Sequence, residues 1–156
     1  MNIIDESGIL AISTRLQRLS DQLRKDGTLI YKAFNIDFEP KWFPVIYTLH
    51  HKPEISVVEL AAEIGYAHPS TISLLKELEK EKLIESKKDA NDERKRLLKL
   101  SSKGRALVTR MQPVWLAMTD ALKELTDTQN NLMKAIDEVE EQFAMKGFYE
   151  RVKRKI

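Results

Sequence analysis

The strongest constraint on the fold of this 156-residue chain is a pair of short helix patterns in residues 55–82, ISVVELAAEIGYAHPSTISLLKELEKEK. Ser56 and Glu59 have the spacing of a capping box, which predicts that a helix begins directly after Ser56. Gly65 is the residue type that most often follows a helix, and Pro69 suits the first turn of the next one. Two short helices joined by a tight glycine-containing turn predict a helix-turn-helix.

Two strand patterns follow this pair of helices and enclose a charged tip. The strands are predicted at 83–86 and 96–100, with KKDANDERK between them. Asp89 and Asp92 can accept backbone N–H groups of the turn and pair with Arg94 or Arg96, which would hold the tip in one shape. A helix-turn-helix followed directly by a two-stranded hairpin is a winged helix, and the hairpin tip is its wing.

Helical periodicity accounts for most of the remaining chain. Further helices are predicted at 8–34, 41–50, 101–125 and 126–146, the last closed by Gly147. Pro113 lies inside the third of these, so a kink or break is expected near Met111. The predicted fold class is mostly α with a small β-hairpin wing, a winged helix-turn-helix domain flanked by N- and C-terminal dimerisation helices.

Composition narrows the range of functions that the chain can have. The formal net charge is +2, yet residues 76–105 hold eleven Lys or Arg and seven acids, a net +4, so positive charge is concentrated around the wing. The chain has no cysteine, which excludes disulfides and thiol redox sensing. The N-terminus lacks the pattern of a secretion signal, and no segment is apolar enough to span a membrane, so a soluble cytoplasmic protein is expected.

The second helix of the pair presents its polar face away from Leu74, Leu75 and Leu78. Short polar side chains there can contact base edges, and lysines can contact phosphates. A basic wing can lie along phosphates or place Arg94 in the minor groove. The predicted DNA-binding residues are His68, Pro69, Ser70, Ile72, Ser73, Lys76, Lys80, Lys87, Lys88, Arg94, Lys95 and Arg96.

Two other interpretations of this surface stay open. Lys76 and Lys80 could form an ordinary solvated face, paired with neighbouring acids one turn away. A winged helix can also serve protein–protein contact, but that use favours an apolar face where Ser70, Ser73 and Lys76 stand.

The wing sequence DANDERKRLLKLSSKG resembles the signature of the MarR family of bacterial regulators, Asp-x-x-Asp-x-Arg followed by a strand and Leu-(Ser/Thr)-x-x-Gly. The matching residues are Asp89, Asp92, Arg94, Leu100, Ser101 and Gly104, and Leu60, Ala61, Gly65, Leu78, Leu83 and Ile84 match the helix-turn-helix of the family. Two positions depart from it: Ser73 stands where an arginine is common, and Lys82 where glycine is common. The first departure leaves base specificity open.

The resemblance implies one MarR-like domain over residues 1–156, with dimerisation helices at about 8–34 and 105–146 and a DNA-binding lobe at about 41–104. A homodimer is also a natural use for the apolar residues Leu10, Met133, Ile136, Val139, Phe143 and Phe148, although these helices could simply pack within one chain. Residues 38–47, FEPKWFPVIY, are similar to a subgroup often fused to a GNAT acetyltransferase, a domain for which these 156 residues have no room.

Family members often bind a small anionic or aromatic effector between the dimerisation region and the DNA-binding lobe. The candidate ligand-binding residues are Arg18, Tyr31, Trp42, Tyr47 and His50, of which Trp42 and Tyr47 have core packing as the alternative. His50 and His51 are adjacent on a helix and do not converge on a metal. No cofactor, metal site or catalytic motif is predicted, and no enzyme activity.

The sequence therefore predicts a DNA-binding transcriptional regulator, a ligand-responsive repressor that binds a pseudo-palindromic operator as a homodimer. The alternative is a stand-alone regulatory subunit, related to the acetyltransferase fusions, that acts through protein–protein contact.

Overall fold

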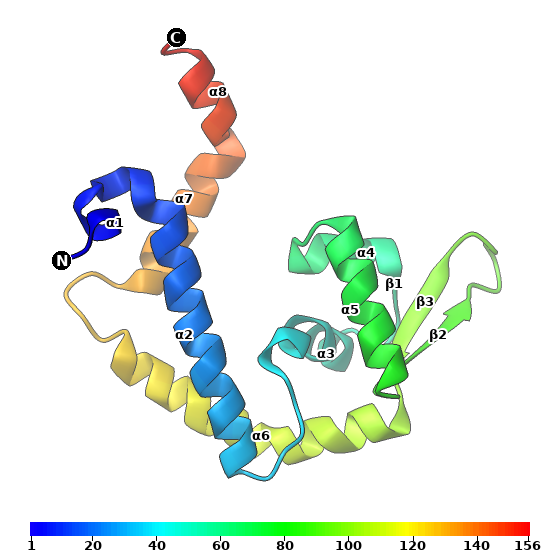
Figure 1. The fold of residues 1–156 in the computed structure, drawn as a ribbon. Helices are drawn as coiled ribbons and strands as arrows, with labels where there is room; N and C mark the ends of the chain where they lie inside the picture. Colours follow the sequence, from blue (N-terminus) through cyan, green and yellow to red (C-terminus); the bar gives the residue numbers. More distant parts are fainter. The chain divides into compact units, whose positions relative to one another are not determined.

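The computed structural model describes all residues 1–156 and divides them into two compact units, Met1–Val114 and Trp115–Ile156. In chain order the first unit contains α1 (Ile3–Glu6), the 3-10 turn η1 (Gly8–Ala11), α2 (Ile12–Ala33), the 3-10 turn η2 (Pro40–Trp42), α3 (Phe43–His51), β1 (Ile55–Ser56), α4 (Val57–Ile64), α5 (His68–Lys80), β2 (Ile84–Lys88) and β3 (Arg96–Leu100). Helix α6 (Ser102–Leu125) begins in the first unit and ends in the second, which also contains α7 (Leu132–Met145) and α8 (Phe148–Lys153) (Figure 1). The prediction of a mostly helical chain with a small hairpin is confirmed.

The sheet has three antiparallel strands in the order β1-β3-β2. Within the wing hairpin, Ile84 pairs with Leu100 and Lys88 with Arg96. Strand β1 was not predicted, because two residues are too short to show an alternating pattern. It ties the start of α4 to the wing by pairing Ile55 with Leu98.

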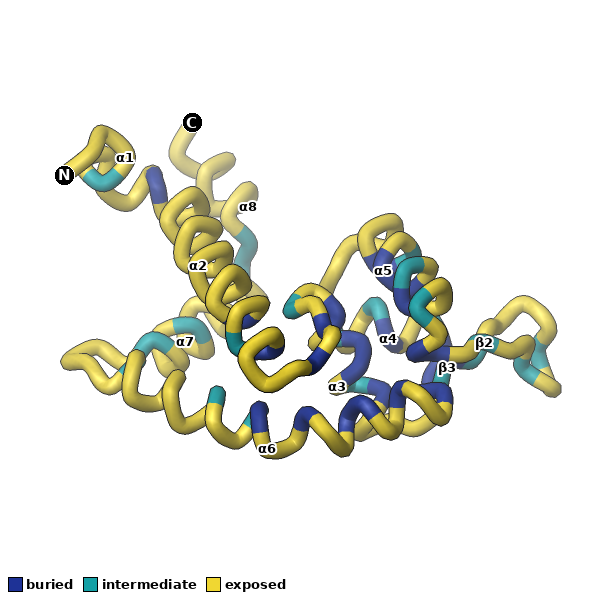
Figure 2. The backbone as a smooth tube through the Cα atoms, turned by 60° about the horizontal axis from the view of Figure 1, so that its bottom comes forward, coloured by how far each residue is buried: buried dark blue, intermediate teal, exposed yellow.

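The core of the first unit lies among α3, α4, α5, the sheet and the beginning of α6, and Figure 2 shows the buried positions gathered there. Its fully buried members include Val45, Ile46, Leu60, Leu78 and Met111. Because each helix contributes an apolar face at three- and four-residue spacing, the polar faces of α4 and α5 remain at the surface.

The predicted local signals of the helix-turn-helix are confirmed. The Ser56 hydroxyl accepts from the Glu59 backbone N–H at 3.1 Å, and the Glu59 carboxylate accepts from the Ser56 N–H at 3.2 Å. Gly65 ends α4 with φ of 73°, in the left-handed region that glycine adopts without a steric penalty. Pro69 lies in the first turn of α5, where its missing N–H leaves no helical bond unmade.

Two long helices differ in detail from their prediction. The segment expected to be one helix from residue 8 begins with the 3-10 turn η1, whose first residue Gly8 has φ of 65°, and is α-helical only from Ile12. Of the kink or break expected near Met111, a break does not occur, because helix α6 continues through Pro113. A proline inside a helix removes one backbone bond, and the many bonds of a 24-residue helix keep the flanking turns in place.

The final helix also differs from prediction. It begins at Leu132 rather than near Asp127, because the Asn131 side chain caps it by accepting from the Lys134 backbone N–H at 3.0 Å. Gly147 does not close this helix by a left-handed turn; it precedes the unpredicted helix α8 with φ of −69°.

The terminal helices expose large apolar side chains. On α1, η1 and α2 most positions are exposed, and Leu10 is 89% exposed. Helices α7 and α8 contain no buried residue (Figure 2). None of the helices has the length and apolar character needed to cross a membrane.

Candidate nucleic-acid interface

Helix α5 presents a polar face, as its sequence predicts. Thr71, Leu74, Leu75 and Leu78 are buried on the inner side. The Thr71 hydroxyl donates to the Ala67 carbonyl at 3.1 Å, which fixes the first turn of the helix to the preceding loop. The outer side carries His68, Pro69, Ser70, Ser73, Lys76 and Lys80, all exposed, with Ile72 half-buried at its edge.

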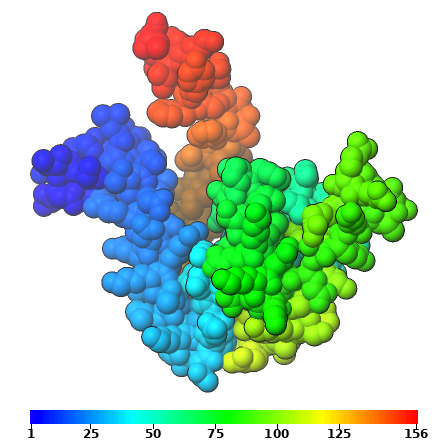
Figure 3. Space-filling model, turned by 45° about the vertical axis from the view of Figure 1, so that its right-hand side comes forward, coloured from blue at the N-terminus to red at the C-terminus, as the bar shows by residue number.

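The wing is held by the two aspartates, as predicted. The Asp89 carboxylate accepts from the Asn91 backbone N–H at 2.8 Å, and the Asp92 carboxylate accepts from the Arg94 N–H at 3.1 Å. The Asp92 carboxylate also lies 3.5 Å from Arg94 Nε. These contacts order the turn while leaving the Arg94 side chain 94% exposed. Figure 3 shows the hairpin tip standing out from the rest of its lobe.

The five predicted wing cations are all exposed, but they differ in their contacts. Lys87 Nζ lies 3.4 Å from a Glu54 carboxylate oxygen, and Arg96 donates to the Ser86 hydroxyl, so both are partly engaged within the protein. Lys88 and Lys95 form no ion pair. The wing therefore offers cationic groups for an external anion.

The surroundings of Lys76 and Lys80 test the alternative interpretation, in which these lysines belong to an ordinary solvated face of the helix. That interpretation expects them to pair with neighbouring acids, and neither forms an ion pair. Two exposed lysines without an ion pair therefore stand on the same side of α5 as the two serines.

Sequence reasoning missed an acidic residue on α5 that contacts the 3-10 turn η2. Glu77 Oε1 accepts from Trp42 Nε1 at 3.2 Å and lies 2.9 Å from Lys41 Nζ, which also lies 3.2 Å from a Glu39 oxygen. The hydrogen bond from Lys41 holds the pKa of Glu77 below its usual value, and the bonds to Glu77 and Glu39 raise the pKa of Lys41. Because 35 positions separate Trp42 from Glu77, no local pattern could have indicated the contact.

The five proposed effector residues do not share one cavity. Tyr31 and Trp42 are buried, and each packs edge-on against Phe38. Tyr47 and His50 are exposed on α3; the Tyr47 ring stacks on Phe43, and His50 Nε2 lies 3.4 Å from Gln112 Nε2. The ligand-binding assignment stays a prediction.

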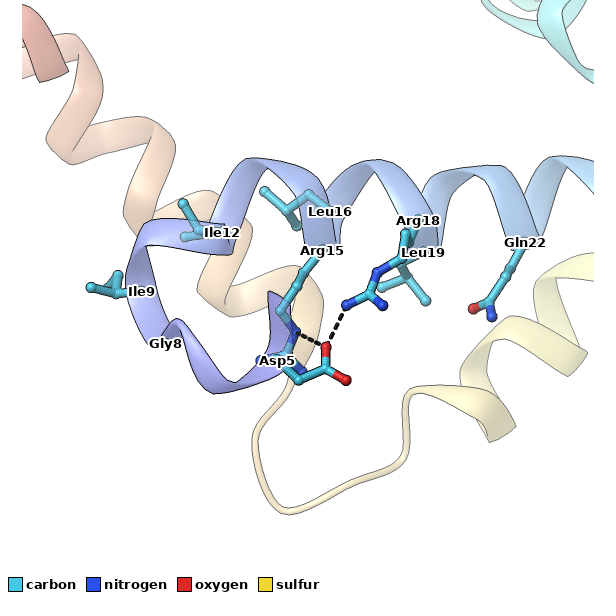
Figure 4. Close-up of a pocket in the computed structure, with 9 residues that line it drawn as sticks. All are labelled: Asp5, Gly8, Ile9, Ile12, Arg15, Leu16, Arg18, Leu19 and Gln22. Carbon is cyan, nitrogen blue, oxygen red and sulfur yellow. Dashed lines mark hydrogen bonds and ion pairs between the residues drawn. The ribbon is translucent and has the colours of Figure 1, made fainter. Parts of the chain in front are cut away.

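Arg18 lies instead in a pocket of about 690 Å³ that is lined by residues of α1, η1 and α2. Figure 4 shows Asp5 turned toward Arg15 and Arg18, with Ile9, Ile12, Leu16 and Leu19 on the same lining. Arg18 donates to the Asp5 carboxylate, which lowers the pKa of Asp5, so the acid already neutralises part of the cationic charge in this pocket.

The structure places no group of three or more His, Cys, Asp or Glu side chains where they could hold a metal ion. The rings of His50 and His51 stand nearly perpendicular, with centroids 4.9 Å apart.

Comparison with known proteins agrees with this geometry. The model of the MarR family matches residues 36–95. A mutant MarR from E. coli, solved with operator DNA, is 21% identical with a TM-score of 0.65, over 90% of this chain and 98% of that one. The regulator MOSR from M. tuberculosis, solved with DNA, is 18% identical with a TM-score of 0.68, over 84% and 92%. PcaV from Streptomyces coelicolor, solved with its natural ligand, is 15% identical with a TM-score of 0.63, over 86% and 95%. Among curated protein sequences, none matches significantly.

The fold and the site together define a winged helix-turn-helix protein. Residues 36–95, which contain α3, the helix-turn-helix and the charged wing tip, match the model of the MarR family, and the chain shares the fold of the solved MarR over most of its length.

Proposed function

We propose that this protein is a sequence-specific DNA-binding transcriptional regulator that uses α5 to read bases and the wing to hold the backbone. One observation carries the proposal: the exposed polar face of α5 and the exposed cations of the wing lie on one lobe, and several of these cations have no partner within the protein. Such surfaces bind the phosphates of duplex DNA, and the short side chains Ser70 and Ser73 allow bases to approach closely. MarR and MOSR were solved with DNA, which supports the same use of this fold.

The proposed active form is a homodimer that reads a pseudo-palindromic operator. Two copies of α5 are needed to contact two half-sites one helical turn apart. Each unit exposes apolar side chains that a second copy can cover, among them Leu10 and Leu16 in the first unit and Val139 and Phe143 in the second. Light scattering at micromolar protein concentration should give twice the chain mass of 18.1 kDa. A monomer would refute this part of the proposal.

Repression controlled by a small effector is the form of regulation we propose, supported by PcaV, which was solved with its natural ligand. The resemblance of residues 38–47 to regulators fused to an acetyltransferase stays a prediction, because the match to residues 36–95 does not distinguish subgroups.

The decisive experiment selects duplexes from a random-sequence pool with the purified protein and then titrates a selected and a random duplex at several salt concentrations. A regulator should enrich a two-fold-related motif and bind it with a steep salt dependence. Equal, weak binding to both duplexes would contradict sequence-specific regulation and favour the protein-contact alternative.

A further inference from the structure

A carboxylate on α5 lies where it should oppose DNA binding. Glu77 follows Ser70 by two helical turns, which places the two residues within about 20° of each other around the helix axis. It is one turn from Ser73 and half-buried. An unpaired negative charge beside two predicted base-contacting serines would repel the phosphates that Lys76 and Lys80 attract.

Two side chains of the 3-10 turn η2, directly before α3, engage that carboxylate. Lys41 Nζ and Trp42 Nε1 both approach Oε1 of Glu77, at 2.9 Å and 3.2 Å. The Lys41 ammonium neutralises the charge of the Glu77 carboxylate, and the fixed indole N–H of Trp42 holds the same oxygen in position. The contact joins η2 to α5, which the chain separates by α3, β1 and α4.

The Trp42 donor is held in place by packing. Its side chain is only 3% exposed, and its ring lies 5.6 Å from that of Phe38 at an interplanar angle of 85°. Phe38 in turn lies 4.9 Å from the Tyr31 ring of α2. Because the indole is packed against the aromatic cluster, it provides a rigid reference for the orientation of α5.

We propose that Glu77 is a positioning residue for sequence reading: Lys41 and Trp42 hold its carboxylate, which fixes the rotation of α5 about its own axis and withholds the negative charge from the DNA. The proposal rests on the proposed DNA-binding function. In this role Glu77 contacts no base, but it supports sequence specificity by holding α5 in the orientation that reads the bases.

The sign of the effect of Glu77→Gln on DNA binding separates this role from a simple charge effect. The substitution removes a negative charge, so electrostatics alone predicts tighter binding to every duplex. Loss of positioning predicts instead that the affinity ratio between the selected and the random duplex falls about tenfold, as expected for losing a charged hydrogen bond. Glu79→Gln is the matched control, because it makes the same charge change on an exposed residue of α5 that forms no ion pair. Equal tightening on both duplexes by both variants would overturn the proposal.

Hydrogen exchange of the α5 amides provides a readout without DNA. Glu77→Gln and Lys41→Met should both accelerate exchange across residues 68–80, whereas Glu79→Gln should leave it at the wild-type rate. Unchanged exchange in the first two variants would overturn the positioning role, even if specificity falls, because Glu77 would then act directly on the DNA.

If the wild-type protein enriches no motif from the pool, the proposed function fails, and the exchange rates still decide whether Lys41 and Trp42 order α5.

Discussion

The main-chain oxygen of Leu83 lies 2.2 Å from the position that a Cβ atom would take on Gly104. This close approach joins the end of the helix-turn-helix to the first turn of α6. Ser101 completes the junction, since its backbone N–H donates to the same Leu83 oxygen at 3.0 Å and its hydroxyl accepts from the Gly104 N–H at 3.0 Å. The Leu-Ser-x-x-Gly part of the wing signature therefore has a structural explanation.

Gly104→Ala should destabilise the protein by about 1–3 kcal/mol, because backbone atoms must move to admit the methyl group. The free energy of unfolding from urea titration measures this. Gly147→Ala is the control: its nearest neighbour would be the Phe143 ring at 3.8 Å, an ordinary contact. Comparable stability of the two variants would show that the junction relaxes easily.

Lys82→Gly should stabilise the protein by about 0.5–1 kcal/mol, because Lys82 has φ of 60°, a left-handed conformation that costs a residue with a Cβ. Lys82→Ala retains the Cβ and should give no gain. Thermal and urea unfolding of the two variants test the difference. A gain shared by both would point to the lysine charge rather than to backbone strain.

Arg94→Ala should weaken binding to a selected duplex by about 1–3 kcal/mol, since we propose that this exposed side chain enters the minor groove. The Asp92 contacts to the Arg94 backbone remain in this variant, so the wing should keep its shape. A fluorescence-anisotropy titration gives the affinity. Binding equal to that of the wild type would remove the wing tip from the mechanism.

Lys76→Ala should lower the slope of log affinity against log salt by about one, as expected for the loss of one phosphate contact. The effect should be similar for selected and random duplexes, because phosphate contacts carry no sequence information. Lys134→Ala, an exposed lysine on α7, is the matched control and should leave the slope unchanged. A slope unaffected by either substitution would return Lys76 to the status of a solvated surface residue.

The contribution of the Lys41–Glu77 pair to stability should depend on pH at both extremes. The folded-state pKa of Glu77 is below its ordinary value of 4.5, so this stabilisation is present above pH 4.5 and is lost as pH falls through the lowered pKa. The pKa of Lys41 is raised above 10.5, so its share is present below pH 10.5 and is lost as pH rises through the raised value. Urea unfolding of wild type and Glu77→Gln from neutral pH down to about pH 3 should show their stability difference shrinking in acid. A constant difference would show that the carboxylate charge does not contribute.

Local sequence determined the winged-helix part of the chain closely. The capping box at Ser56, the left-handed Gly65 and the two wing aspartates all have the contacts that their spacing predicts, because each acts within a few residues of itself. The buried and exposed faces of α5 follow from its period for the same reason. The predicted start of the last long helix near Asp127 was wrong, because Asn131 provides the cap, and Pro113 does not break α6.

Only the tertiary structure decided the contacts between distant segments. The pairing of β1 with β3, the seating of Gly104 against Leu83 and the hold of Lys41 and Trp42 on Glu77 join residues that share no local pattern. Packing brings these groups together, and the low exposure of Trp42 and Leu83 then makes their positions definite. Sequence thus fixes which surface of α5 faces outward, whereas its orientation on the lobe depends on the packed neighbours of that helix.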